Sequence, residues 1–592
     1  MARQTRREVD VVIVGLGWTG GILARELSEA GLTVVALERG GPRHTNPDFA
    51  VPMIRDELRY AVRHDLMANP ARDTITFRNT VGETALPMRR LGSFLPGEGV
   101  GGAGVHWNGQ QWRWSPVDHA IRTYYEERYG RSYIPEDMNL QDWGVSYAEL
   151  EPYYDRFEYV AGVSGRAGNL RGELQPGGNV FEGARSREYP LPPLERSYSN
   201  ELFEGAATRL GYHPFPRPSA NASRPYTNPD GSRLGACQYC GHCERFGCEA
   251  NAKGSPHVTV IPLALERPNV ELRTHAWVTR VDLDSTGTRA VGVTYVDLTS
   301  GDEVTQPAAL VALCAYSYNN VHLMLLSGIG RPYNPADGTG LVGKNYCYQV
   351  GGGVRLFFEK AIFNPFMGTG GLGTVIDDFH ANEAFDRAPL GVIGGGTISN
   401  GSSGGRPIQS RSVPPGTPRW GSDWKRATAK WYGRSMSIGG SVSNMPNREN
   451  CLDLDPTYRN VFGQPLLRMT YDFVENDYKL SEFIARKAYE IGRTLDPDII
   501  TEPGGRTGSY SIVPYQSTHN TGGTIMGAHP GESVVNRYLQ SWDVPNLFVL
   551  GASVFTHNSA YNPTGPVGAL AYWTAAAIVE RYLRDPGPLV DV

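Results

Sequence analysis

Four cysteines lie close together in the 592-residue sequence, at Cys237, Cys240, Cys243 and Cys248. Their CxxCxxCx4C spacing places four thiolates on one short loop. A zinc site more often takes two CxxC pairs that are a dozen or more residues apart, whereas a single compact run can wrap an iron–sulfur cluster. Cysteines this close rarely form a disulfide without strain. The spacing therefore favours iron and sulfur, with zinc and disulfides as the alternatives.

Glycines near the N-terminus form a second chemical signature. A short apolar run, residues 11–14, ends in the sequence GLGWTG, which contains Gly15, Gly17 and Gly20. Gly15 would permit a tight turn, Gly17 would let a pyrophosphate approach a helix N-terminus, and Gly20 would let helix and strand pack closely. Glu38 ends the next apolar run, near the position expected of an acid that binds a ribose hydroxyl. The pattern predicts a dinucleotide site for NAD or FAD, and a glycine-rich turn without a nucleotide is the alternative.

A second glycine-rich segment spans residues 95–107 and reads LPGEGVGGAGVHW. Backbone with so many glycines can lie directly against a large flat ring system and its diphosphate. A mobile surface loop is the alternative, but such a loop rarely carries apolar residues like Val100 and Val105. The segment is therefore a candidate for contact with the ring system of the cofactor.

Composition limits the possible function classes. The chain carries 56 Lys and Arg against 61 Asp and Glu, a formal charge of −5, which excludes a generally basic nucleic-acid binder. Hydrophobic residues make up 40% of the sequence, enough to fill large cores. Arg6 and Arg7 precede an apolar run that is too short for a secretory signal, which needs about 7–15 residues. The longest uncharged apolar run, residues 566–579, suits a buried helix and not a membrane span.

Several motifs together resemble the glucose-methanol-choline (GMC) oxidoreductases. They are the N-terminal fingerprint, the glycines at 99–102 with Trp107 after them, LLSGIG at 325–330, VGKN at 342–345 and the C-terminal segment around His519. Within that family, the segments WTG, GVGGAG, TYYEERYG, LDLDPTY, RYLQSWDV and YNPTG are most similar to the flavoprotein subunits of bacterial membrane-bound gluconate 2-dehydrogenases. The motifs run from residue 11 to near the C-terminus, so the resemblance covers nearly the whole chain.

The resemblance implies FAD as the cofactor and a [3Fe-4S] cluster on the cysteine run. Such a cluster uses three cysteines, so one of the four would be a spare, and the sequence does not identify it. His106 matches a histidine that related enzymes join covalently to the flavin, and a histidine that only packs against FAD is the alternative. The predicted cofactor contacts are Gly15, Gly17, Gly20, Glu38, Gly101, Gly102, His106, Trp107, Val278, Gly551, Ala552 and Asn562.

The segment 517–527 resembles the family segment that presents a catalytic histidine to the flavin, which makes His519 the predicted base. An imidazole titrates near pH ~6.5, which suits removal of the alcohol proton as hydride leaves the same carbon for flavin N5. The second position of the family pair is Asn562, which can bind the substrate hydroxyl but cannot act as a base. His529 and His557 are expected to be structural.

The predicted fold is α/β, with a discontinuous Rossmann-like FAD-binding domain and an interleaved α+β substrate domain built on an antiparallel sheet. The FAD-binding domain must be discontinuous because its first strand, flavin loop, cysteine loop and catalytic end lie near residues 11, 100, 240 and 515. Its predicted segments are 7–50, 90–120, 195–345 and 510–592, with the cysteine loop at 237–248. Segments 121–194 and 346–509 are assigned to the substrate-binding domain and its insertions.

The resemblance implies an FAD-dependent dehydrogenase that oxidises a secondary hydroxyl of a sugar acid or sugar, with D-gluconate to 2-keto-D-gluconate as the leading prediction. Electrons would leave singly through the cluster, so oxygen would not be the acceptor. The implied partners are a small subunit that carries an export signal and a membrane-bound multihaem cytochrome c. They would place the chain at the periplasmic face of the inner membrane, and without them the expected location is cytoplasmic. The alternatives are a pyranose or glycoside 3-dehydrogenase and a non-catalytic electron-transfer subunit.

Overall fold

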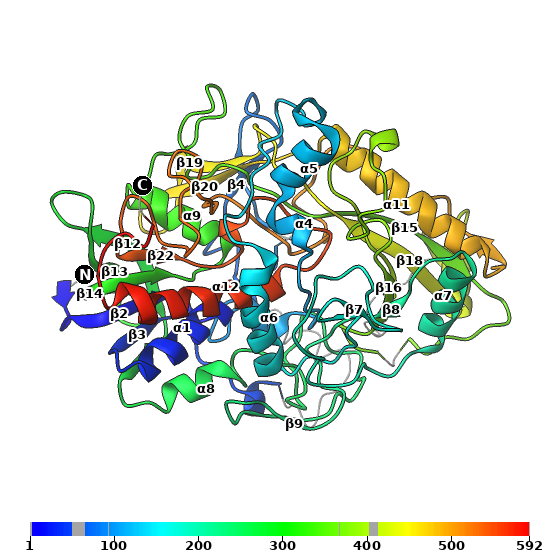
Figure 1. Ribbon diagram of the computed structural model, residues 1–592, viewed down its shortest axis with the longest axis horizontal. Helices are drawn as coiled ribbons and strands as arrows, with labels where there is room; N and C mark the ends of the chain where they lie inside the picture. Colours follow the sequence, from blue (N-terminus) through cyan, green and yellow to red (C-terminus); the bar gives the residue numbers. More distant parts are fainter. Residues whose placement is uncertain are drawn as a thin grey trace.

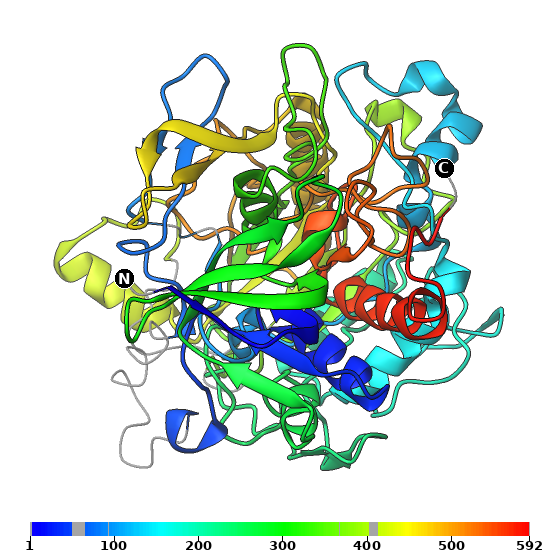
Figure 2. The ribbon, with the colours of Figure 1, turned by 90° about the vertical axis from the view of Figure 1, so that its left-hand side faces the viewer.

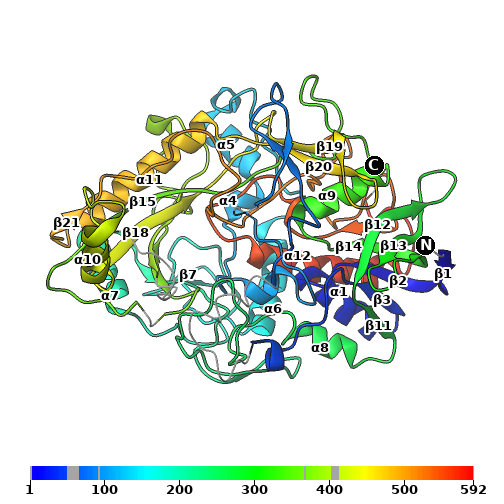
Figure 3. The ribbon, with the colours of Figure 1, turned by 180° about the vertical axis from the view of Figure 1, so that it is seen from behind.

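The computed structural model describes residues 3–49, 66–90, 92, 94–365, 368–401 and 413–590. Two large sheets lie toward opposite ends of its long axis (Figures 1 and 3). The first carries the N-terminal glycine motif, and a long helix lies along the second. Residue 50, at the end of the first predicted FAD-binding segment, and residues 91 and 93 in the second segment lie outside the described part of the chain.

The first sheet has a parallel centre. Its strands are β1 (Arg3–Thr5), β2 (Val9–Val14), β3 (Val34–Leu37), β11 (Val270–Arg273), β12 (Ala276–Leu283), β13 (Ala290–Asp297), β14 (Glu303–Leu313) and β22 (Leu547–Val549). β11, β3, β2 and β14 pair in parallel in that order, and β22 and β1 also pair with β14 in parallel. β13 and β12 continue the sheet as antiparallel strands. The central strands are apolar and buried, as a parallel sheet covered on both faces requires.

Helices from opposite ends of the chain cover this sheet. They are α1 (Trp18–Glu29), α8 (Val260–Leu265), α9 (Ser317–Leu326) and α12 (Thr564–Ala577). α1 and α12 lie side by side (Figures 1 and 2), and α12 also packs against α6 (Tyr147–Ala161). Ser146 and Glu149 form a capping box at the start of α6, and Gly162 ends the helix in the left-handed conformation.

The second sheet is antiparallel. Its strands, in spatial order, are β21 (Ile499–Ile500), β15 (Val350–Phe357), β18 (Ser435–Val442), β17 (Ile398–Gly401), β16 (Gly373–Ile376) and β8 (Phe215–Pro216). α11 (Glu475–Arg493) packs on β15 and β18 (Figure 3), and α7 (Tyr198–Arg209) packs on β16 and β17. Glycines permit this close approach, because a Cβ added to Gly352 in β15 would stand 2.4 Å from the Ser481 carbonyl oxygen of α11.

A smaller four-stranded sheet contacts α9. Its strands are β19 (Cys451–Arg459), β20 (Pro465–Thr470), β4 (Thr76–Arg78) and β5 (Leu86–Pro87). Shorter elements complete the described chain: α3 (Ala103–His106), α4 (Pro116–His119), α5 (Ile121–Tyr129), β6 (Asn169–Leu170), β7 (Glu173–Leu174), β9 (Tyr226–Thr227), β10 (Arg233–Leu234) and α10 (Gly421–Trp431). No helix in the described ranges is both long enough and apolar enough to cross a lipid bilayer.

The arrangement confirms the predicted α/β class, with a discontinuous Rossmann-like sheet and a separate antiparallel sheet. Several elements cross the predicted domain limits. α7 comes from the predicted FAD-binding segment 195–345 but packs on β16 and β17 of the antiparallel sheet. β8 comes from the predicted FAD-binding segment 195–345 but joins the antiparallel sheet. α6 comes from the predicted substrate segment 121–194 but packs on α12. The exact domain boundaries therefore stay predictions.

Candidate active site

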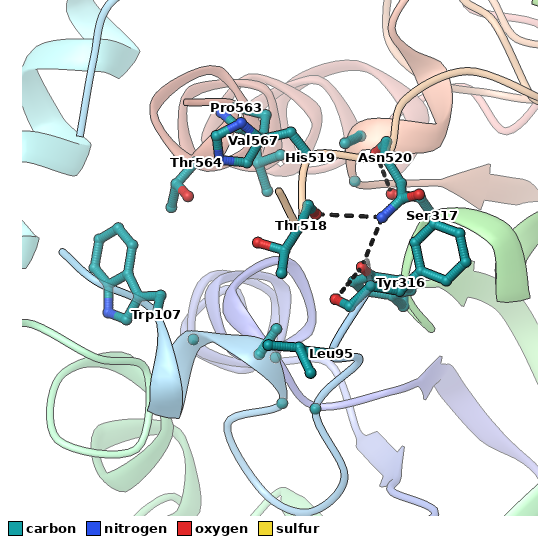
Figure 4. A pocket seen from close by; sticks show the side chains of 18 of the residues that line it. Leu95, Trp107, Tyr316, Ser317, Thr518, His519, Asn520, Pro563, Thr564 and Val567 are labelled. Carbon is teal, nitrogen blue, oxygen red and sulfur yellow. Dashed lines mark hydrogen bonds between the residues drawn. The ribbon is translucent and has the colours of Figure 1, made fainter. Parts of the chain in front are cut away.

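A cavity of about 610 Å³ separates the two large sheets. The turn between β2 and α1 and residues of α9 line one side, and residues of β16, β17 and β18 line the other. The predicted reacting pair, His519 and Asn562, lines this cavity together with His106. Figure 4 shows Trp107, Tyr316 and His519 around the same space. The structure therefore brings segments from the whole length of the chain to one site.

The N-terminal glycines form the turn that precedes α1. Gly15 has φ +92°, and a Cβ there would lie 2.6 Å from the Cys314 carbonyl oxygen. A Cβ on Gly20 would lie 2.1 Å from the Gly15 carbonyl oxygen, so only glycine lets α1 pack against this turn. At Gly17, which caps α1, the nearest atom would be 3.9 Å away, so its backbone is open to the cavity. This geometry fits a diphosphate at the N-terminus of α1.

Glu38 lies directly after β3 and lines the same end of the cavity. Its carboxylate accepts hydrogen bonds from the backbone amides of Leu16 at 3.1 Å, Gly40 at 2.9 Å and Gly99 at 3.2 Å. Burial raises the pKa of Glu38, and these three amides oppose the rise. The carboxylate is therefore held in place by the backbone at the position where a nucleotide ribose would lie.

The second glycine loop holds His106 at the cavity wall. The Gly101 amide donates to the Leu16 carbonyl at 2.7 Å, which ties this loop to the dinucleotide turn. His106 Nε2 lies 3.0 Å from the Leu95 carbonyl oxygen, and Nδ1 has no hydrogen-bond partner among the described residues. Because a ring nitrogen that faces a carbonyl must donate, Nδ1 carries the lone pair. Burial, together with Lys253, lowers the pKa of His106 to about 4, so the ring is neutral.

The other predicted cofactor contacts differ in their placement. Those that line the cavity are Gly102, Trp107, Val278, Gly551 and Ala552. Gly101 and Gly20 are not in the cavity wall, and both allow close packing instead. A Cβ on Gly101 would stand 2.6 Å from a methyl group of Val105.

His519 lies between two side-chain amides. Asn562 Nδ2 is 2.9 Å from Nε2 of His519, and Gln349 Oε1 is 2.5 Å from Nδ1. The Nε2 group of Gln349 donates to the carbonyls of Ser559 and Ala560, each at 3.3 Å, so its oxygen must face the imidazole. Nδ1 of His519 therefore carries the proton, and Nε2 keeps the lone pair that a base needs.

Burial lowers the pKa of His519 to about 4. The imidazole is therefore neutral near pH 7 and can accept a proton there. The Asn562 amide next to the lone pair would give a substrate hydroxyl a second polar partner. The two side chains can together bind a hydroxyl group and remove its proton.

The four cysteines lie beside the cavity and not in its wall. Cys243 is buried, Cys237 and Cys248 are partly buried, and Cys240 is exposed. The Thr369 hydroxyl donates to Cys243 Sγ at 3.2 Å. Burial raises the pKa of Cys237 to about 12, and the nearby thiols of Cys243 and Cys248 act in the same direction. Among the described residues, no three metal-binding side chains converge as the ligands of one ion would.

Polar contacts join the cysteine loop to the flavin loop. The Arg245 amide donates to the His106 carbonyl at 2.7 Å. The buried ammonium group of Lys253 donates to the carbonyls of Trp107 at 2.7 Å and Cys243 at 3.1 Å. The cysteine loop is thus fixed directly behind His106.

Sequence reasoning missed Gln349 and Lys253. Gln349 precedes the glycine-rich strand β15, and no local pattern separates it from its neighbours. Lys253 follows the cysteine run by five residues, and its position after Cys248 is a signal that could have been used. His529, which is exposed, and His557, whose Nε2 lies 3.2 Å from Asp118, are both outside the cavity wall.

Comparison with known proteins extends these observations. GMC oxidoreductase family models match residues 141–350 and 446–571. The chain is 48% identical to the gluconate 2-dehydrogenase flavoprotein of Pantoea cypripedii, over 99% of this chain and 96% of that one. It is 26% identical to the fructose dehydrogenase large subunit of Gluconobacter japonicus, over 96% and 97% of the two chains.

A solved structure shares the fold. Pyridoxine 4-oxidase from Mesorbium loti superimposes with a TM-score of 0.57 at 17% identity, over 98% of this chain and 100% of that one. The family matches and the extended similarity confirm the predicted resemblance. The chain belongs to the GMC oxidoreductase family, as a flavoprotein that acts on CH–OH donors.

Proposed function

We propose that this protein oxidises the C2 hydroxyl of D-gluconate to 2-keto-D-gluconate and passes the electrons through a [3Fe-4S] cluster to a cytochrome c. The observation that carries the reaction is the neutral His519 beside Asn562 in the wall of the cavity. The choice of substrate is supported by 48% identity to a gluconate 2-dehydrogenase flavoprotein along almost the whole chain.

The residues of the chain have separate roles in the proposed reaction. The glycine turn, Glu38 and the His106 loop would hold FAD, which would supply the acceptor for a hydride from the substrate carbon. Asn562 holds the substrate hydroxyl, and His519 Nε2 takes its proton. Gln349 keeps the proton of the resting imidazole on Nδ1.

The proposed route for electrons follows the cysteine loop. Cys237, Cys243 and Cys248 are the less exposed cysteines of the loop, and three is the number of thiolates that a [3Fe-4S] cluster would need. In the described chain these side chains do not converge as the ligands of one ion would, so the cluster is proposed from the cysteine spacing. Cys240 is the exposed cysteine and would be the spare. The loop also contacts the segment that would hold the flavin, through Arg245 and Lys253. A cluster here would lie beside the flavin and could remove its electrons singly.

Partner subunits complete the proposal. A small subunit with an export signal would bind the chain at the periplasmic face of the inner membrane. A membrane-bound multihaem cytochrome c would accept the electrons there. The name of one relative, a dehydrogenase large subunit, supports a multisubunit assembly. If the genome that encodes this chain lacks such partners, the cytoplasm becomes the expected location.

The test is the absorption spectrum of the purified protein under anaerobic conditions, before and after addition of D-gluconate, D-glucose or a glucoside. Gluconate should bleach the flavin band. In the His519→Ala variant the rate of bleaching should fall by about 10²–10⁴-fold, because general-base catalysis contributes that much. His529→Ala, at an exposed position outside the cavity, is the matched control and should keep the native rate.

The outcomes separate the alternatives. Bleaching by the pyranosides alone would overturn gluconate as the substrate and identify a pyranose dehydrogenase. Bleaching by none of the three, in a protein that still relays electrons from an artificial reductant, would identify an electron-transfer subunit.

A further inference from the structure

Three arginines line the cavity: Arg39, Arg217 and Arg245. Arg39 forms an ion pair with Asp73, and the guanidinium of Arg245 lies 3.3 Å from the carboxylate of Glu244. Arg217 differs, because no carboxylate among the described residues lies within ion-pair distance of its guanidinium. The third acidic residue of the cavity wall, Glu38, is held by backbone amides at the nucleotide end.

The guanidinium of Arg217 is held by hydrogen bonds at the edge of the antiparallel sheet. Arg217 follows β8, and its side chain donates to the Ser399 hydroxyl at 2.7 Å and the Leu372 carbonyl at 3.3 Å. Gly373 and Gly401 leave room for it. A Cβ at Gly373 would stand 2.7 Å from Cζ, and a Cβ at Gly401 would stand 2.8 Å from Nη1.

This arrangement leaves a cation without a carboxylate partner in the described part of the chain. The Arg217 side chain is only partly exposed, and its burial lowers its pKa to about 10, so the group stays charged at neutral pH. A cation that is partly withdrawn from water without a partner costs free energy, and such cations are normally paired. The guanidinium has five N–H donors, and the two bonds above go to neutral oxygens. The remaining donors suit a planar anion such as a carboxylate.

The same sheet connects Arg217 to the reacting pair. Ser399 of β17 pairs with Gly439 of β18, and both residues line the cavity. Ser441 of β18, which also lines the cavity, pairs with Gly351 of β15. Gln349, which holds His519, lies just before that strand. One sheet therefore carries the unpaired cation and the residue that orients the base.

We propose that Arg217 binds the carboxylate of the substrate and so selects sugar acids over neutral sugars. The inference deepens the proposed function and rests on it. The substrate supplies the missing anion, and its desolvated ion pair with Arg217 forms only when an acid is bound. A neutral sugar of the same length leaves the cation unpaired and therefore binds more weakly.

The test compares D-gluconate with D-glucitol, which has CH2OH in place of the carboxylate. In Arg217→Met, the Kd for gluconate in anaerobic flavin reduction should rise by about 10–150-fold, because a hydrogen bond to a charged group contributes about 1.5–3 kcal/mol. The Kd for glucitol should change by no more than about 2-fold. The Kd of Arg217→Lys for gluconate should lie between those of the native protein and Arg217→Met, because lysine keeps the charge but lacks the planar guanidinium group. Arg196→Met removes an exposed arginine outside the cavity and should leave both values unchanged.

Two further measurements keep the result interpretable. Flavin content and melting temperature show whether Arg217→Met is folded, and guanidinium ion added to Arg217→Ala should restore part of the gluconate affinity. Calorimetric binding of gluconate to His519→Ala, with and without Arg217→Met, reports binding without turnover.

The outcomes distinguish this inference from the proposed function. Gluconate oxidation with an unchanged Kd in Arg217→Met, or an equal loss for both substrates, would overturn the role of Arg217 and leave the function standing. Gluconate that binds through Arg217 but never reduces the flavin would overturn the function and support the anion site.

Discussion

The tautomer of His519 is set by Gln349, a neutral side chain that also lines the cavity. The Gln349 amide is fixed by two backbone carbonyls, and this leaves only its oxygen for the imidazole. An acceptor beside Nδ1 makes Nε2 the basic nitrogen. Gln349 is neutral, so burial alone sets the low pKa of His519.

We expect Gln349→Glu to raise the pKa of His519 by about 1–3 units, because a carboxylate beside Nδ1 stabilises the imidazolium. In the native protein the base is lost as the pH falls through about 4. In the variant the neutral imidazole is lost at higher pH. The acid limb of the kcat/KM profile should therefore move to higher pH by the same amount. The measurement is the pH profile of anaerobic flavin reduction by substrate.

Gln349→Leu is the control for this profile. It removes the acceptor without adding charge, so it should slow the reaction without moving the acid limb upward. Coincident acid limbs in the native protein and Gln349→Glu would contradict the role of Gln349.

His106 has the form of a flavin-attachment residue, since it is neutral and has an unpartnered Nδ1. After acid precipitation, we expect the flavin to stay with the native polypeptide and to leave the His106→Ala polypeptide. His322→Ala is the control, because His322 lines the same cavity but lies on α9, outside the glycine-rich segment that holds His106. Flavin in the supernatant of the native protein would show that His106 only packs against FAD.

Single residues were predictable where a motif fixes a backbone conformation or a chemical type. Gly15, Glu38, His519 and Asn562 belong to this group, and they line one cavity. Arg217 was not predictable, because its role depends on the absence of a carboxylate partner near it in space. The local sequence Pro216-Arg217-Pro218 does not indicate which side chains lie near the arginine in the folded chain.

At the scale of elements, the cavity depends on helices that are remote from the chemistry. α12 lines the cavity through Thr564 and Val567, and α6 supports α12 from the side. The first turn of α6 is secured by the Ser146 hydroxyl, which accepts from the Glu149 amide at 3.3 Å. A change in the stability of this cap would therefore affect the cavity wall through α6 and then through α12.

Ser146→Ala should destabilise α6 by about 1 kcal/mol, because an N-cap hydroxyl contributes about that much. We expect faster hydrogen exchange in the first turn of α6 and in the part of α12 that it contacts. Ser197→Ala removes the same kind of capping box from α7, which packs on the other sheet, and should leave exchange in α12 unchanged. Equal exchange in α12 of the native protein and Ser146→Ala would show that α6 does not support that helix.

Elements were predictable where their apolar pattern is regular. Residues 11–14 form a buried strand with α1 directly after it, as the pattern indicates. β15 is different, since its sequence VGGGVRLF has low strand propensity. Its glycines are there because α11 and β18 approach the backbone closely, and only the folded structure contains that information.

At the scale of the whole molecule, the cysteine loop is the proposed exit for electrons. It lies directly behind His106, through contacts of Arg245 and Lys253. Under the proposed function, the two half-reactions would be separate in space, with substrate on the sheet side and the cysteines behind the flavin loop.

Cys243→Ser should therefore separate these half-reactions. We expect loss of iron and of the cluster's electron paramagnetic resonance signal, retained flavin reduction by substrate, and at least tenfold slower reoxidation of the flavin by a cytochrome c. Cys451→Ser is the control, because Cys451 is a buried cysteine in β19 outside the cluster loop. A full iron content in Cys243→Ser would remove Cys243 from the ligand set.

The order of strands in the parallel sheet affects how the chain can be made in the cell. β2 is made nearly three hundred residues before its partner β14, and β22 pairs with the other edge of β14 only at Leu547–Val549. At about 5–20 residues per second, synthesis leaves this edge of β14 without its final neighbour for roughly 12–47 seconds. During that interval the apolar edge of β14 is open to non-native pairing in the nascent chain.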